Sequence, residues 1–225
     1  AGLLQRGLDV LCEKPLAQSL PEAEELARLA EGHRRMLMVG FNRRFMPVFT
    51  RAKEFLSDRK IDLCRVWKQG ANLINHTIHM VDVLRFFCGD AVDVQAAGSF
   101  QGQKESALAA VIRFDRGAIG VFETSARVGA RLETMEAHGD GFSVYVQAPD
   151  KAVMHAGGQE HTYRPQSQTW FVESPQHYGF VEEVSHFLHA VRTRTPPACS
   201  AADALKTHRL VFQIIAAAQA HGRQA

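Results

Sequence analysis

The chain has 225 residues, of which 46% are hydrophobic and 22% are charged, the proportions of an ordinary globular protein. Its net charge of +2 is too small to favour binding to nucleic acid or to an anionic membrane surface. No run of about 18 apolar residues occurs, so a membrane-spanning helix is not expected.

Four cysteines lie far apart, with no C-x-x-C pair, at Cys12, Cys64, Cys88 and Cys199. This spacing predicts reduced, mostly buried thiols in a cytoplasmic protein. Residues 1–7 lack the basic start and the apolar core of a secretion signal. They resemble the end of a helix that stops at Gly7, so we expect the sequence to be incomplete as given.

The first 40 residues predict a strand, a helix and a second strand. An apolar run at residues 8–12 predicts the first strand, and another at residues 36–39 predicts the second. Between them, Ser19 with Glu22 three residues later has the pattern of a capping box for a helix that runs to about His33. A strand, helix and strand at this spacing favour a parallel pair with a right-handed crossover, as at the edge of a doubly wound sheet.

The rest of the chain predicts a different architecture. Residues 45–57 and 74–87 favour helices, with a strand at 61–68 between them, and residues 91–163 favour strands with hairpin turns at 115–117 and 139–141. Two helices, at 177–194 and 201–221, end the chain. The predicted fold class is therefore α/β plus α+β: the C-terminal remnant of a doubly wound Rossmann sheet in residues 1–44, then a domain of residues 45–225 with a large, mostly antiparallel open sheet and flanking helices.

The open sheet predicts self-association. Leu108, Ala110, Ile112 and Phe114 alternate along one strand, and an apolar sheet face of this kind tends to be buried against another copy. We therefore expect a homodimer or a homotetramer formed through the sheet.

A short segment with polar or charged side chains follows each of the first two predicted strands. Residues 13–15 read Glu-Lys-Pro, and residues 40–44 read Gly-Phe-Asn-Arg-Arg. Ligands of open α/β sheets bind at the carboxyl ends of the strands. A lysine in such a cleft can have a lowered pKa and can exchange a proton with a substrate hydroxyl, so Lys14 is a candidate; the alternative is an ordinary solvated turn.

A second candidate group is Asn75, His79 and Asp82, whose spacing places them on one face of an α-helix. His79 can serve as an acid or base near pH 7, held by a polar neighbour. The alternatives are a hydrogen-bonded histidine at a packed helix edge and a metal site with His76, which the spacing supports weakly. The sequence contains no G-x-G-x-x-G, no G-x-S-x-G and no H-E-x-x-H.

Taken in chain order, these motifs resemble those of the Gfo/Idh/MocA family of oxidoreductases. The E-K-P segment at residues 13–15, the V-G-F-N-R-R-F segment at residues 39–45 and the N-x-x-x-H-x-x-D segment at residues 75–82 each correspond to a family motif. The last two predicted helices are also similar, so the resemblance covers nearly the whole chain. Arg43, Arg44 and Pro47 resemble the MviM-like subgroup.

The resemblance implies a dehydrogenase that uses NAD or NADP to oxidise sugars, polyols or related cyclic alcohols. Lys14 would face the substrate hydroxyl, and His79 would be its partner acid or base, with Asn75 beside it. The cofactor cleft would be lined by Glu13, Lys14, Pro15, Asn42 and Arg43, and no metal would be needed. The alternative is a non-catalytic relative of the same fold that binds a dinucleotide or a sugar only to sense it.

The sequence departs from the family pattern in three ways. The glycine-rich phosphate loop is absent, so we expect this chain alone to bind a dinucleotide weakly or not at all. Asn75 stands where the family often has Asp, and an amide cannot stabilise a charged His79. The link from residue 68 to residue 75 is also shorter than in most members.

Overall fold

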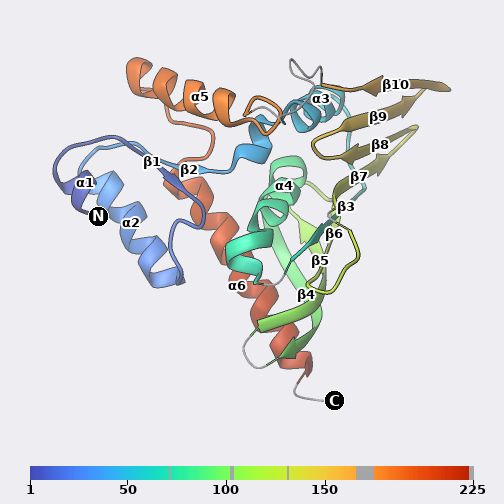
Figure 1. Cartoon of the computed structure of the whole chain (residues 1–225), viewed down its shortest axis with the longest axis horizontal. Coiled ribbons are helices and arrows are strands. Elements are labelled where there is room, and N and C mark those ends of the chain that lie inside the picture. Colours follow the sequence, from blue (N-terminus) through green and yellow to red (C-terminus); the bar gives the residue numbers. More distant parts are fainter. Residues whose placement is uncertain (71, 102–103, 131, 166–174, 223–225) are drawn as a thin grey trace.

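The computed structural model describes residues 1–225 except 71, 102–103, 131, 166–174 and 223–225. It contains two separate sheets, one of two strands and one of eight (Figure 1). The helices α1 (Gly2–Gln5) and α2 (Leu20–Gly32) accompany the small sheet. The predicted α/β and α+β parts are therefore both present.

The small sheet pairs β1 (Val10–Glu13) with β2 (Leu37–Gly40) in parallel, and Glu13 lies opposite Gly40. The helix between them begins as predicted: Ser19 is its N-cap, and the Ser19 hydroxyl accepts from the Glu22 backbone N–H at 3.5 Å and donates to the Glu22 carboxylate at 2.9 Å. Both strands therefore end at the same edge, which brings the Glu-Lys-Pro turn beside the start of η1 (Asn42–Phe45).

The large sheet has the strand order β10-β9-β8-β7-β3-β6-β5-β4. The bounds are β3 (Leu63–Gln69), β4 (Ala91–Gln101), β5 (Lys104–Phe114), β6 (Ile119–Ser125), β7 (Glu133–Gly139), β8 (Phe142–Gln147), β9 (Lys151–Ala156) and β10 (Gln159–Tyr163). The predicted hairpins, β5–β6 and β7–β8, are confirmed. One central pair, β3–β6, is parallel, because α4 and the hairpin of β4 and β5 separate these strands along the chain.

Helices cover one face of this sheet. α4 (Ile78–Cys88) packs on β3 and β6, α6 (Ala201–Gly222) packs on β4, and α3 (Pro47–Phe55) packs on β8 and β9. α6 also contacts α2, so it joins the large sheet to the α/β part (Figure 1). Helix α5 (Phe180–Thr193) packs instead on η1.

The prediction that Leu108, Ala110, Ile112 and Phe114 form an open face is wrong. All four side chains are buried within this chain, on the face that the helices cover. The opposite face carries the exposed side chains of the same strands, among them Val111. Strand alternation identified the apolar positions, but it could not indicate which helices would cover them.

The helix predicted at residues 74–87 is two elements. A π-helical turn, η2 (Leu73–Thr77), precedes α4. Asn72, in the left-handed region at φ 70°, caps this turn by accepting the Asn75 N–H at 3.1 Å. Asn75 therefore lies in the π-helical turn, outside the regular α-helix that carries His79 and Asp82, so the prediction of one α-helix over all three is wrong. π-helical turns are rare and are frequent at functional sites.

Candidate active site

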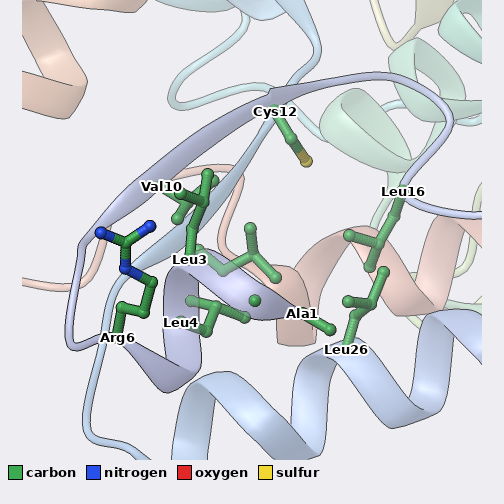
Figure 2. A pocket seen from close by; sticks show the side chains of 10 residues that line it. Ala1, Leu3, Leu4, Arg6, Val10, Cys12, Leu16 and Leu26 are labelled. Atoms are coloured by element: carbon green, nitrogen blue, oxygen red, sulfur yellow. The ribbon is translucent and has the colours of Figure 1, made fainter.

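One pocket lies beside the small sheet but lacks the polar groups of a catalytic site. Figure 2 shows this cavity of about 490 Å³, which α1, α2 and β1 surround. Its lining includes Leu3, Leu4, Val10, Cys12, Leu16 and Leu26, and among the described lining residues Arg6 carries the only charged side chain. The candidate catalytic residues lie elsewhere, at the carboxyl ends of β1 and β2.

Lys14 connects the small sheet to the turn that precedes α4. It follows the last residue of β1, and its Nζ donates to the backbone carbonyl of Asn75 at 2.5 Å. The side chain is half-buried, and burial lowers its pKa, assisted by the charge of Arg43 and opposed by that of Glu13. A lysine with a lowered pKa can accept and return a proton closer to neutral pH than a solvated lysine can.

His79 lies in the first turn of α4 and is only 6% exposed. Its Nδ1 has no hydrogen-bond partner among the described residues, and its ring meets the ring of Phe41 edge-on at 6.1 Å between centroids. Burial lowers its pKa well below 6.5, and the nearby charges of Arg43, Lys68 and Lys14 lower it further. Burial thus favours the neutral form of His79, and its Nδ1 is left available to a ligand.

Asn75 and Asp82, the predicted neighbours of His79, form hydrogen bonds with other residues. The Asn75 side-chain oxygen accepts from Gln18 Nε2 at 2.8 Å. Asp82 is fully buried and binds Arg44 through two hydrogen bonds, of 2.7 and 2.6 Å. The two residues help to shape the site, but in this conformation neither carries a hydrogen bond to the histidine.

Arg43 and Asn42 are held from within the protein. Arg43 forms a two-pronged ion pair with Glu133, with distances of 2.8 and 3.0 Å, and donates to Asn42 Oδ1 at 2.9 Å. Asn42 is only 1% exposed, and its Nδ2 donates to the Tyr178 carbonyl at 2.9 Å. Of the residues predicted to line the cofactor cleft, Glu13 is exposed, Lys14, Pro15 and Arg43 are half-buried, and Asn42 is buried.

Two residues of this site were missed from the sequence, Lys68 and Glu133. Lys68 is 9% exposed, and its Nζ meets Glu133 Oε2 at 2.5 Å. Burial raises the pKa of Glu133, but the hydrogen bonds and charges of Arg43 and Lys68 overcome this effect and lower the pKa to about 2. The alternation of side chains along the strand could have indicated Lys68. It follows Cys64 and Val66 at every second position, on the buried face of the strand, where an apolar residue is expected.

Glu183 is a second buried carboxyl near the site. It lies in the first turn of α5, is 3% exposed, and its Oε1 has no hydrogen-bond partner within the described part of the chain. Burial raises its pKa to about 7, assisted by the charge of Glu13 and opposed by that of Arg43. The carboxyl of Glu183 therefore titrates near neutral pH and lies close to Glu13 and Arg43.

We expect Glu183→Gln to stabilise the protein at pH 8 and to change its stability little at pH 4. A carboxyl whose pKa is raised on folding destabilises the native state as pH rises from the unfolded pKa through the folded one. A rise from 4.5 to about 7 corresponds to roughly 3 kcal/mol above pH 7. Thermal unfolding of both proteins at pH 4 and pH 8 measures the effect, and an equal shift at both values would contradict it.

Two domain models of one family match the chain in order. The model described as an oxidoreductase family with an NAD-binding Rossmann fold matches residues 1–41, and the model described as a GFO/IDH/MocA C-terminal domain matches residues 53–145. The chain belongs to the Gfo/Idh/MocA family of NAD-binding oxidoreductases. The family resemblance inferred from the E-K-P, V-G-F-N-R-R-F and N-x-x-x-H-x-x-D segments is confirmed.

Relatives in this family extend beyond the chain. A putative oxidoreductase, YceM of Salmonella typhimurium, is 27% identical over 93% of this chain and 70% of its own length. The myo-inositol 2-dehydrogenase of Thermotoga maritima is 27% identical over 86% of this chain and 65% of its own length. The chain thus spans about two thirds of these curated relatives.

The fold is shared with solved Gfo/Idh/MocA structures. A dehydrogenase (MviM) from Clostridium difficile superposes with a TM-score of 0.83 at 23% identity, over 95% of this chain and 73% of that one. Within the described residues, no group of three or more His, Cys, Asp or Glu side chains is arranged to hold a metal ion. Among the described helices, none has both the length and the apolar character that a membrane span requires.

Proposed function

We propose that the protein transfers a hydride between a nicotinamide cofactor, NAD or NADP, and the carbinol carbon of a sugar, a polyol or a related cyclic alcohol. The observation that carries the proposal is the position of Lys14. It lies at the carboxyl end of a parallel strand, where dinucleotide-binding sheets hold their ligands, and its Nζ reaches the turn that leads to His79.

The residues at this edge fit a cofactor with hydrogen-bonding groups. His79 Nδ1 and Glu183 Oε1 are buried atoms without a hydrogen-bond partner in the described chain, and buried polar atoms are normally satisfied. Glu13, Lys14 and Pro15 would line the cleft, with Asn42 and Arg43 supporting it from behind. When bound, the nicotinamide would accept the hydride.

The proton of the substrate hydroxyl needs a separate acceptor. In its neutral form, the Lys14 amine would take this proton as the carbinol becomes a carbonyl, and it would return the proton in the reverse reaction. His79, neutral and buried, would hold the substrate oxygen by a hydrogen bond without adding charge. Asn75 would position Lys14 through the carbonyl that accepts from Nζ.

The test is an assay of nicotinamide reduction by the full-length protein with sugars, inositols and linear polyols. Turnover with any of these alcohols supports the proposal. Binding of the cofactor and of a sugar without turnover would instead favour the sensing relative, and the absence of binding to any of them would contradict both.

We further propose a division at residue 44 and a cytoplasmic location. Residues 1–44 contain the small parallel sheet, and residues 45–225 contain the large one. The four cysteines are all free thiols, as is usual in a reducing compartment.

Self-association through the large sheet is a further proposal, and it concerns the face that none of the described helices covers. Leu63, Val111 and Tyr145 are 41%, 48% and 42% exposed there, and apolar side chains on an open sheet favour burial against another copy. Light scattering at micromolar concentration should show a dimer or a tetramer. Val111→Glu should shift it toward the monomer, whereas Leu188→Glu on α5 should not; a monomeric parent protein would contradict the proposal.

A further inference from the structure

The inner face of the large sheet is apolar along most of its length and becomes polar at one end. On β3, Cys64 and Val66 precede Lys68, and in the register of the sheet Lys68 lies opposite Thr124 on β6 and near Glu133 on β7. The polar end follows directly into the segment that leads to η2, the turn bonded by Lys14. The position of Lys68 at the end of β3 therefore places it beside the candidate active site.

Two cations share one buried carboxylate at this end of the sheet. Glu133 is the carboxylate that both Arg43 and Lys68 bind: one oxygen accepts from Arg43, and the other accepts from Arg43 and Lys68. Lys14 is a third cation close by, since its charge acts on Lys68. Glu133 is thus shared between two cations, whereas Glu13 is the carboxylate that acts on Lys14, and an anionic group of a ligand would complement Lys68.

Lys68 has unused hydrogen-bonding capacity. An ammonium carries three N–H donors, and among the described residues Lys68 donates to Glu133 alone. The side chain is almost fully buried, where unsatisfied donors are costly. Its two remaining donors match the two oxygens of a carboxylate, which is an acceptor only when ionised.

Resting on the oxidoreductase function proposed above, we propose that the substrate carries a carboxylate as well as the carbinol that is oxidised, and that Lys68 binds this carboxylate. Lys14 then remains free to handle the hydroxyl proton. The substrate class is that of the sugar acids and other hydroxy acids rather than neutral sugars.

The experiment compares matched substrates that differ only at one carbon. The probes are D-glucuronate against D-glucose and D-galacturonate against D-galactose, with the full-length protein, and the measurement is kcat/KM for nicotinamide reduction. A charge-assisted hydrogen bond contributes about 10- to 100-fold, so we expect the acid to be preferred by at least about 10-fold. Lys68→Met should abolish this preference, and Lys68→Arg should keep part of it.

Lys53→Met is the matched control. Lys53 is another partly buried lysine with a lowered pKa, but it lies on α3 and donates to the Phe86 carbonyl at 2.7 Å, outside the site. Its loss should leave the acid preference unchanged. Glucose 6-phosphate tests the kind of anion, and a higher kcat/KM for it than for D-glucuronate would overturn the carboxylate assignment.

Two results separate this inference from the proposed function. Equal or better turnover of the neutral sugars, or an acid preference that survives in Lys68→Met, overturns the inference and leaves the oxidoreductase proposal intact. Where no probe turns over, calorimetry with D-glucuronate in the presence of NAD⁺ decides. Binding that Lys68→Met weakens by about 10-fold or more supports the inference, and the absence of binding overturns it.

Discussion

Lys14→Met should lower kcat by about 100-fold or more while the affinity for the cofactor changes by only a few-fold. A positioned general acid or base contributes roughly 10² to 10⁴-fold to a rate, and methionine keeps the length of the side chain without its proton carrier. The measurement is steady-state kinetics of the full-length protein on its best alcohol, with cofactor binding measured by calorimetry.

The pH profile adds a readout that a structural role would not change. The pKa of Lys14 is lowered from 10.5, so oxidation by the parent enzyme should rise with pH as the amine loses its proton, and this rise should vanish in Lys14→Met. Lys53→Met removes a buried lysine elsewhere and should retain both the rate and the profile. Near-normal turnover by Lys14→Met would show that Lys14 is an ordinary turn residue.

The variant His79→Asn should lower kcat by less than Lys14→Met does, because a neutral imidazole contributes only a hydrogen bond.

The first part of the fold was predictable because its signals are local. The capping box at Ser19 and the apolar runs on either side of it specify a strand, a helix and a strand without reference to the rest of the chain. The hairpins at residues 115–117 and 139–141 were equally clear, since glycine at 117 and at 141 has a positive φ in the structure. Lys14 was placed correctly at a strand end for the same reason.

The errors arose where distant segments decide the outcome. Helical spacing predicted one α-helix for Asn75, His79 and Asp82, but Asn75 lies in a π-helical turn that Asn72 caps and that precedes the α-helix. Glu133 joins Arg43 across 90 residues of sequence, and no local pattern links them. The alternation of side chains along the strand places Lys68 at a position where a buried apolar residue is expected. That signal can be interpreted only when the face of the strand that is buried is known.

Asp82→Asn should destabilise the folded protein by about 3 kcal/mol, because it removes the most buried partner of Arg44 and leaves the ion pair with Asp203 at 2.8 Å as its remaining compensation. Asp82 is fully buried and accepts two hydrogen bonds from Arg44 and one from Thr207 at 2.8 Å. The charge of Asp82 overcomes the burial of Arg44 and raises the arginine's pKa above its ordinary value. The amide of asparagine would direct N–H donors at a guanidinium that has only donors of its own.

Chemical unfolding at pH 7 measures this loss, with Asp93→Asn as the matched control. Asp93 pairs with Arg113 at 3.4 Å on the surface, where both side chains are largely exposed, and such a pair contributes less than about 1 kcal/mol. The double variant Arg44→Met with Asp82→Leu should recover much of the stability, since an apolar pair can replace a buried ion pair. A loss from Asp82→Asn no larger than that from Asp93→Asn would show that the Arg44 contact contributes little. A normal stability combined with a large fall in kcat would instead return Asp82 to the role first inferred from its spacing, as a partner of His79 in the reaction.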